Sequence, residues 1–298
     1  MQLTLGPVFY YWPRARLDAF YAAISASPIE RVHLGEAVCS RRHEYRIDDW
    51  LDAAARLADA GKEVVLSTQV LMESEADLRA LRRLAADGRF LLEANDMGAV
   101  HAIAGRAAFV AGPHLNIYNA QTLGFVASLG ASRWVPPFEM TRESLAAILA
   151  EKPADVATEV FVWGRMPLAY SARCFTARYY DVSKDDCGFV CLDHADGLTL
   201  KTREDDGFLV LNGIQTQSHR VLDLAAALRD MAALGIEAIR LSPQAESMDQ
   251  VIAAFRAALD GAAPEEVATS LASALPAPPC NGYWHGRPGL DWVGPRAA

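Results

Sequence analysis

The chain has 298 residues, of which 52% are hydrophobic, and it carries a formal net charge of -9. This composition is typical of a globular protein with one large core or two ordinary ones, and the acidic balance argues against nucleic acid or an anionic membrane surface as the main partner. The N-terminus lacks a basic segment, and no apolar run approaches the ~20 residues that span a bilayer, so we expect a cytoplasmic protein whose thiols stay reduced.

Short β-type runs alternate with amphipathic helical patterns along most of the chain. The clearest helical patterns cover residues 46–61, 73–88 and 219–235, and each ends at a glycine. Strands that alternate with helices favour parallel pairing through right-handed crossovers, and eight such units close most simply into a (β/α)8 TIM-barrel-like α/β fold. A doubly wound open sheet is the alternative, but no G-x-G-x-x-G motif follows the first strand. The predicted strands are residues 3–9, 31–36, 63–68, 90–94, 107–111, 133–138, 158–163 and 236–242.

The alternation breaks after the seventh predicted strand. Within the long interval that follows, the segment 165–215 contains short β-type runs joined by the polar turns HADG and REDDG, which predict a small antiparallel β insertion. The tail over 275–298 is rich in Pro and Gly, and we expect it to pack irregularly. We therefore predict a single domain over 1–298 that carries this cysteine-bearing insertion and an irregular tail.

Four of the five cysteines form a candidate ligand set: Cys39, Cys174, Cys187 and Cys191. Cys39 follows the second predicted strand and Cys174 the seventh, and in a barrel both loops emerge at the same C-terminal face. The other two can fold back from the insertion. Four thiolates suit zinc or an iron–sulfur cluster, and supply from separate loops favours a [4Fe-4S] cube; unligated buried thiols are the third interpretation. We expect Cys280, in the tail, to be an inert packed thiol.

Polar side chains at or just past the predicted strand ends are candidates for the barrel mouth, where this fold usually places its chemistry. We select Asn116 and Glu139 as possible pocket residues, with helix capping or loop packing as the competing interpretation. Arg41 and Arg42, directly after Cys39, either place positive charge beside an anionic group or are solvated. The sequence identifies no catalytic residue. The wider set of strand-end residues is Glu93, Asn95, Asn116, Asn119, Glu139, Gln215, Arg240 and Gln244.

The segment EVFVWGRMPLAYSARC carries a family pattern. Its E-x-F-x-x-G motif, which runs from Glu159 to Gly164 and leads to Cys174, resembles the signature of the collagenase-like peptidase family of unassigned catalytic type, as do RVHLGEAVCSRR, GPHLNIYNAQTL and WVPPFEMT. The chain departs from the signature at Pro167, where the family usually has its first cysteine. Cys39 stands in for the lost ligand, and this exchange is similar to the subgroup that serves ubiquinone biosynthesis without oxygen.

The resemblance implies a [4Fe-4S] cluster ligated by Cys39, Cys174, Cys187 and Cys191. It also implies a heterodimer with a sister protein of the same family, UbiU, and a UbiT-like lipid carrier as a further partner. The implied activity is O₂-independent hydroxylation of a ubiquinone precursor under anaerobic conditions, for which an iron–sulfur centre can handle electrons. Two other hypotheses stay open: a collagenase-like peptidase or other hydrolase, and a non-catalytic partner subunit stabilised by its cluster.

Overall fold

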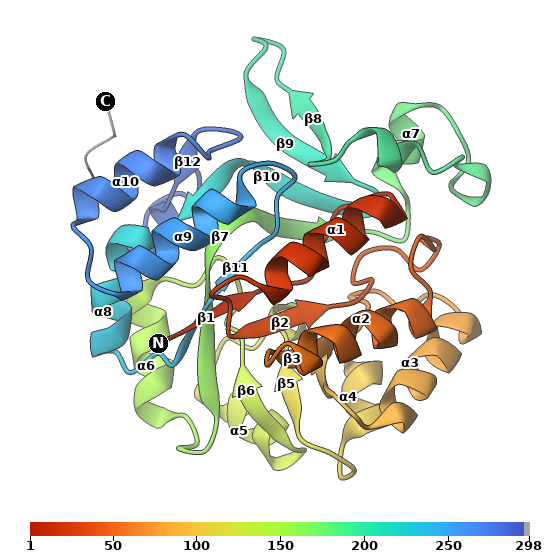
Figure 1. Ribbon diagram of the computed structural model, residues 1–298, viewed down its shortest axis with the longest axis horizontal. Helices are drawn as coiled ribbons and strands as arrows, with labels where there is room; N and C mark the ends of the chain where they lie inside the picture. Colours follow the sequence, from red (N-terminus) through yellow and green to blue (C-terminus); the bar gives the residue numbers. More distant parts are fainter. Residues whose placement is uncertain (295–298) are drawn as a thin grey trace.

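Eight parallel strands close into a barrel in the computed structural model, which describes residues 1–294 (Figure 1). The last barrel strand, β11, pairs with both β7 and β1 and so closes the ring. The predicted (β/α)8 fold is confirmed, and each predicted strand overlaps one barrel strand. These strands are β1 (Gln2–Leu5), β2 (Arg31–Leu34), β3 (Glu63–Ser67), β4 (Leu91–Ala94), β5 (Phe109–Ala111), β6 (Ala131–Trp134), β7 (Ala157–Tyr170) and β11 (Ala238–Leu241).

Helices surround the barrel and bury one face each against its strands (Figure 1). In α2, Trp50, Leu51 and Leu57 share the buried face, which is the amphipathic pattern that predicted this helix. In α3, the Ser74 hydroxyl accepts a hydrogen bond from the N–H of Asp77 and caps the first turn. The helices are α1 (Arg14–Ser25), α2 (Ile47–Asp59), α3 (Glu75–Asp87), α4 (Met97–Ile103), α5 (Ala120–Ser128), α6 (Arg142–Glu151), α8 (Leu228–Ala233), α9 (Met248–Leu259) and α10 (Pro264–Ala272).

The helix predicted over 219–235 is wrong in its first part. Residues Gln215–Asp223 form strand β10, a short 3₁₀ turn covers Ala225–Ala227, and only α8 is an α-helix. Pairing determines the outcome: Val221 and Leu222 pair with β7 in antiparallel and with residues 279–280 in parallel, and both side chains are almost completely buried. Long-range pairing overrides the local helical pattern here.

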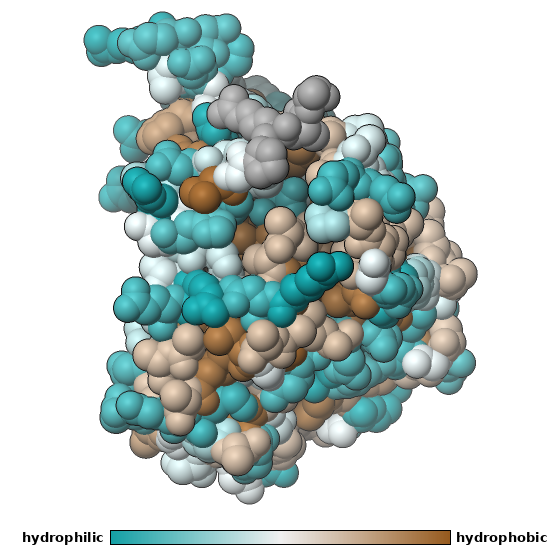
Figure 2. All heavy atoms as spheres, turned by 90° about the vertical axis from the view of Figure 1, so that its left-hand side faces the viewer, coloured by the Kyte–Doolittle hydropathy of each residue, from teal (hydrophilic) through white to brown (hydrophobic). Residues whose placement is uncertain are grey.

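The predicted antiparallel insertion is confirmed between β7 and β11. Strand β7 continues past the barrel, and β10, β9 (Gly207–Asn212) and β8 (Leu198–Lys201) add to it in antiparallel order. Before β8 the chain forms α7 (Phe175–Tyr179) and two 3₁₀ turns, Lys184–Asp186 and Val190–Asp193. The hairpin of β8 and β9 projects from the body and is hydrophilic at its tip (Figures 1 and 2).

The tail packs on the insertion and the barrel. A two-residue strand, β12 (Pro279–Cys280), pairs with β10, and a 3₁₀ turn follows over Gly282–His285. The side chain of Trp284 in this turn is buried. Residues 295–298 of the predicted tail lie outside the described part of the chain. Within residues 1–294, no helix is both long and apolar enough to cross a membrane.

The barrel interior holds a network of charges. Arg240 on β11 donates from Nε to Oε1 of Glu159 on β7 at 2.7 Å and pairs through Nη1 with Oε1 of Glu93 on β4, also at 2.7 Å. His33 on β2 places Nε2 at 3.2 Å from Glu159 and Nδ1 at 3.6 Å from Glu93. No side chain of the four is more than 3% exposed. Glu93 and Arg240 therefore lie inside the barrel, below its mouth.

These contacts fix the charges of the network. Burial alone would raise the pKa of Glu159, but Arg240 and then His33 hold it well below its ordinary value. Burial is the main cause that lowers the pKa of His33, and the positive charge of Arg240 lowers it further. The network is therefore a guanidinium between two carboxylates, with a neutral imidazole beside them.

Candidate functional site

Cys39 lies in the loop after β2, and a carboxylate shapes that loop. Oε1 of Glu36 accepts hydrogen bonds from the N–H groups of Cys39 and of the residue before it, both at 3.0 Å. The N–H of Arg42 donates to the carbonyl of Cys39 at 3.0 Å and closes the next turn. Gly35 directly precedes Glu36, and only glycine fits at this position. Its φ is +141°, and a Cβ there would lie 2.5 Å from the carbonyl oxygen of Ser67. The loop is thus held tightly against β3.

Cys174 comes from the start of the insertion, just after β7. It is the N-cap residue of α7, and its Sγ accepts a hydrogen bond from the N–H of Ala177 at 3.4 Å. The N–H of Phe175 donates to the carbonyl of Gly213 at 3.0 Å. The turn between β9 and β10 therefore anchors the beginning of α7 and fixes the position of Cys174.

The C-x-x-x-C segment 187–191 is tied to two barrel loops. Arg41, in the loop after β2, donates from Nη1 to Oδ1 of Asp185 at 2.9 Å. Lys184 pairs with Glu73, in the loop after β3, at 2.6 Å. Ion pairs from neighbouring barrel loops thus hold this part of the insertion at the mouth.

Phe189 lies between the two cysteines of this segment and strengthens the attachment. Its ring packs edge-on against His43, with centroids 4.7 Å apart, and lies 5.7 Å from the ring of Tyr11. Gly188 and Phe189 have φ of +56° and +55°, so the chain bends sharply between the cysteines. The bend directs the aromatic ring onto the Cys39 loop.

The four candidate thiols lie in neighbouring segments at the mouth and interact in pairs. The Cys39 thiol interacts electrostatically with Cys174, and Cys191 interacts with both Cys174 and Cys187. Cys39 and Cys174 also pack against one small apolar group, which consists of Phe9, Ala37, Val38 and Ile214. All four cysteines are partly buried. The fifth, Cys280, is fully buried on β12, and burial raises its pKa to about 12.

The donor set suits a metal centre in chemical type and number. Burial raises the pKa of Cys39 to about 11 and also raises that of Cys191, while Arg42 opposes both shifts. Ligation by a metal would displace the thiol protons, because the thiolate is the ligand. Across residues 1–294 no three His, Cys, Asp or Glu side chains are arranged to hold a single metal ion. Four sulfur donors are the ligands that zinc or an iron–sulfur cluster takes.

Arg42 is the buried cation of this site. Its Nη1 donates to the carbonyl of Phe9 at 2.7 Å and its Nη2 to Oδ1 of Asn212 on β9 at 2.6 Å. The guanidinium also lies 3.6 Å from Glu36 and interacts electrostatically with Cys191. Its side chain is only 1% exposed, so the solvated interpretation does not hold for it. The arginine before it is partly exposed and binds the insertion.

A chain of buried amides leads from Arg42 to Tyr170. Asn212 donates from Nδ2 to Oε1 of Gln215 at 2.8 Å, and Gln215 donates from Nε2 to Oη of Tyr170 at 2.5 Å. Oη of Tyr170 lies 3.5 Å from Nε2 of His114. Tyr170 and His114 both line a cavity of about 560 Å³. One hydrogen-bonded layer therefore separates the cysteines from this cavity.

Asn116 and Glu139, the two selected pocket residues, both line this cavity. Asn116 follows the 3₁₀ turn Pro113–Leu115 and has φ +54°, a conformation that asparagine tolerates. Glu139 follows β6 and accepts a hydrogen bond from the hydroxyl of Tyr118. Both side chains are exposed, so they form part of the rim. Loops after β5 and β6 thus meet at this opening.

The other strand-end residues do not share one location. The structure places Glu93 and Arg240 in the barrel network, Gln215 in the amide chain, Asn119 at the N-cap of α5, and Asn95 and Gln244 in hydrogen bonds with Thr68 and Trp163. Sequence reasoning missed His114 and Tyr170. Their only available signals were that His114 follows a predicted strand and that Tyr170 precedes Cys174 by four residues.

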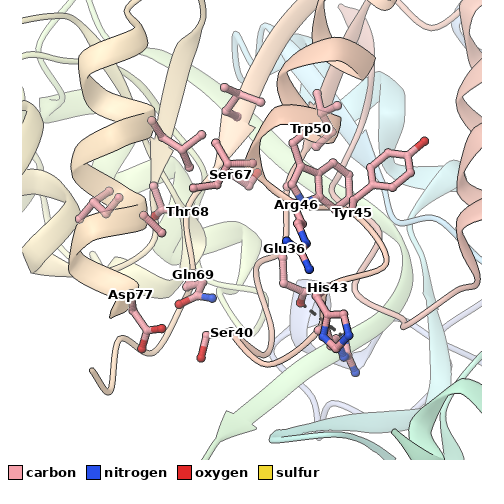
Figure 3. Close-up of a pocket in the computed structure, with 18 of the residues that line it drawn as sticks. Glu36, Ser40, His43, Tyr45, Arg46, Trp50, Ser67, Thr68, Gln69 and Asp77 are labelled. Carbon is pink, nitrogen blue, oxygen red and sulfur yellow. Dashed lines mark ion pairs between the residues drawn. The ribbon is translucent and has the colours of Figure 1, made fainter. Parts of the chain in front are cut away.

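A second cavity, of about 270 Å³, opens between α2 and α3 (Figure 3). Apolar side chains such as Trp50 and Leu81 form much of its wall, while Gln69 and Asp77 add polar groups. Glu36 reaches it from the loop that carries Cys39. This cavity therefore adjoins the cysteine site from outside the barrel.

Comparison with known proteins gives one matching family and several similar solved structures. The sequence pattern of peptidase family U32 matches residues 15–293. The U32 peptidase Mk0906 is similar over 83% of this chain and 94% of its own, with 14% identity and a TM-score of 0.45. A mutant O-GlcNAc hydrolase from Thermobaculum terrenum is similar over 91% of this chain and 62% of its own (9% identity, TM-score 0.40). The Bacillus cereus spore cortex-lytic enzyme SleL is similar over 88% and 75% (10% identity, TM-score 0.42).

Proposed function

The chain belongs to peptidase family U32, and on that basis we propose that it is an iron–sulfur protein of the UbiV type within this family. In this proposal Cys39, Cys174, Cys187 and Cys191 ligate one [4Fe-4S] cluster. The chain pairs with UbiU and takes part in the O₂-independent hydroxylation of ubiquinone precursors, with a UbiT-like lipid carrier as a further partner.

The convergence of four thiols from separate segments supports the proposal most strongly. One thiol comes from a barrel loop and three come from the insertion, and electrostatic interactions connect all four. At Pro167, where the family resemblance leads us to expect a cysteine, the chain has a β7 proline that lines the cavity. Cys39 provides the fourth sulfur from the other side of the mouth.

Arg42 supports the same assignment through its charge. Four thiolates around a cluster accumulate negative charge, and a buried guanidinium offsets part of it without giving up its proton. Charges beside a cluster are among the factors that set its potential, and the Arg42 guanidinium interacts electrostatically with both Cys39 and Cys191. A bound cluster would supply electron transfer at the barrel mouth. Phe189, between Cys187 and Cys191, packs edge-on against His43 and attaches this segment to the Cys39 loop.

Metal analysis of anaerobically purified protein tests the cluster. We expect a brown protein with about four irons and four sulfides per chain and, after reduction, an EPR signal. Each of the four Cys→Ala variants should lose most of the iron. Cys280→Ala is the matched control and should retain it, because Cys280 lies on β12. A colourless protein with one zinc per chain would contradict the cluster.

Co-expression with UbiU under anaerobic conditions tests the reaction. We expect hydroxylated precursor only when both proteins are present and Cys39 is intact. If Cys39→Ala left hydroxylation unchanged while the complex still formed, the chain would be a structural partner of UbiU, not part of the catalytic unit.

A peptidase is the second candidate, favoured by the family and by one geometric observation. Glu139 and His114 open on the same cavity, and a carboxylate and an imidazole are common acid–base groups. Cleavage of an unstructured peptide that is lost in Glu139→Ala and kept in all four cysteine variants would favour the peptidase.

A further inference from the structure

A relay of hydrogen bonds joins the cysteine site to the cavity of about 560 Å³. It starts at Arg42, which interacts electrostatically with two of the candidate thiols, and it ends at His114 on the cavity wall. Side-chain groups make every bond along it, so the direction in which each group donates matters for the next one. The relay consists of Arg42, Asn212, Gln215, Tyr170 and His114.

Arg42 fixes the direction of the relay at its first bond. A guanidinium has hydrogen-bond donors and no acceptor, so the atom of Asn212 that meets Nη2 at 2.6 Å must be the amide oxygen. The amide nitrogen of Asn212 then donates to the carbonyl of Phe9 and to Oε1 of Gln215, both at 2.8 Å. The Phe9 carbonyl is an acceptor only, and it requires the same orientation. The amide of Asn212 therefore has one orientation.

The same direction continues to Tyr170. Because Oε1 of Gln215 accepts from Asn212, Nε2 of Gln215 donates, and it meets Oη of Tyr170 at 2.5 Å. Burial raises the pKa of Tyr170, so the hydroxyl keeps its proton. Among residues 1–294 the other partner of this hydroxyl is Nε2 of His114, at 3.5 Å. This bond is long, but the proton of the hydroxyl has no second acceptor there.

The direction of the last bond decides where His114 carries its proton. Burial lowers the pKa of His114 to about 4, so the ring is neutral and holds one proton near pH 7. A nitrogen that accepts a hydrogen bond has none, and the bond made by one ring nitrogen sets the state of the other. Because Nε2 accepts from Tyr170, the proton lies on Nδ1, which makes no hydrogen bond within residues 1–294. The ring thus offers the cavity a donor and not an acceptor.

We propose that this relay fixes His114 in the tautomer that carries its proton on Nδ1. Arg42, Asn212 and Gln215 act through Tyr170 as positioning residues, and none of the three needs to touch the imidazole. Together they determine which hydrogen-bonding group this part of the wall presents to a ligand. The proposal goes beyond the proposed function, because it requires neither a cluster nor a particular substrate.

Nitrogen NMR of the histidine rings tests the proposal on the full-length protein, because protonated and unprotonated ring nitrogens differ clearly in chemical shift. The protein is labelled with ¹⁵N-histidine, and the signals of His114 are assigned by their loss in His114→Gln. Near neutral pH we expect a proton on Nδ1 and none on Nε2. A wild-type ring with its proton on Nε2 overturns the proposal.

Asn212→Asp should reverse the relay. The new carboxylate still accepts from Arg42 but has nothing to donate, so Gln215 turns its amide nitrogen towards residue 212 and its oxygen towards Tyr170. The Tyr170 hydroxyl then donates to Gln215, and His114 must donate from Nε2. We therefore expect the proton of His114 to move from Nδ1 to Nε2, although two side chains separate residue 212 from the ring.

Tyr170→Phe removes only the last link and deletes a single hydroxyl, so it tests the relay even if Asn212→Asp does not fold. We expect signals of both tautomers in this variant, since nothing then fixes Nε2. Asn281→Asp is the matched control: Asn281 is 5% exposed and bonds to Val293 outside the relay, so the proton should stay on Nδ1.

An unchanged tautomer in either Asn212→Asp or Tyr170→Phe overturns the proposal. A merely structural role of Asn212 would lower stability and leave the proton on Nδ1. Because no outcome depends on iron content or turnover, failure here is distinguishable from failure of the cluster assignment.

Discussion

Replacement of Arg240 by Met should destabilise the protein strongly at neutral pH. The substitution removes the guanidinium that pairs at 2.7 Å with both Glu159 and Glu93, whose side chains are at most 1% exposed, and leaves Glu159 with Arg31 at 3.4 Å. Glu159 keeps the Thr4 hydroxyl at 2.7 Å, and Glu93 keeps the Ser67 hydroxyl at 2.7 Å, but the two carboxylates lose their main counter-charge. Removing one partner of a buried pair costs about 3–5 kcal/mol.

The loss in Arg240→Met should also depend on pH through His33. In the wild type, burial and then Arg240 lower the pKa of His33, so the ring is neutral. Without Arg240, the two carboxylates raise the pKa of His33 in the folded protein. Between the ordinary pKa of about 6.5 and this raised pKa, His33 holds a proton in the folded protein but not in the unfolded chain. This stabilisation is complete below about pH 6.5 and is lost as the pH rises through the folded-state pKa. The destabilisation should therefore be smaller near pH 6 than near pH 8.

Guanidinium chloride denaturation of the two proteins at both pH values provides the measurement. Arg142→Met is the control, because Arg142 binds Asp230 through two bonds of 2.6 and 2.7 Å but is 46% exposed. Its loss should cost at most about 1 kcal/mol. If Arg240→Met cost no more than this control near pH 8, or the same at both pH values, the reasoning on the barrel network would be refuted.

Three further predictions concern other parts of the chain. Arg42→Met should cost about 3 kcal/mol in chemical denaturation, because it removes a buried guanidinium and leaves its partners, Glu36 among them, without their cation. Arg41→Met should cost less than about 1 kcal/mol, since its carboxylate partner is 88% exposed; equal losses would contradict this. Gly164→Ala should lower stability by about 2–4 kcal/mol, because φ is +127° and the new Cβ would lie 2.5 Å from the Cβ of a serine. Gly124→Ala on α5 is the control: a Cβ there would meet no atom within 4 Å, so the substitution should be neutral or stabilising. Burial raises the pKa of Asp223 to about 6, so wild-type stability should fall by about 1–2 kcal/mol between about pH 4 and pH 6, and Asp223→Asn should abolish that fall.

The repetitive part of the fold could be predicted because local patterns and long-range pairing agree there. Most barrel strands are followed by a helix, and only the seventh leads into the insertion instead, so the (β/α)8 order can be read from the sequence. The meeting of Cys39 with Cys174 also follows from topology, since barrel loops at one face are neighbours. The order of the elements along the chain is enough to predict both the barrel and the proximity of these two loops.

Other features depend on pairings that no local pattern reveals. Residues 219–223 resemble the start of a helix, yet β7 provides a strand partner far earlier in the chain, where Arg165 pairs with Val221 and Trp163 pairs with Asp223. Glu93 and Arg240 were placed at the mouth because charge near a strand end usually means exposure. Their burial is possible only because the two strands bring opposite charges together across the barrel.

Strand β7 belongs to both the barrel and the antiparallel insertion. Its 14 residues pair in parallel with β11 near Glu159 and in antiparallel with β10 up to Tyr170. One continuous strand is thus both a strand of the barrel and the first strand of the insertion, which carries three of the four candidate thiols. Heat or denaturant that unfolds the insertion must also disturb β7, which is one of the eight barrel strands. We therefore expect a single cooperative unfolding transition, in which sulfur donors and barrel are lost together.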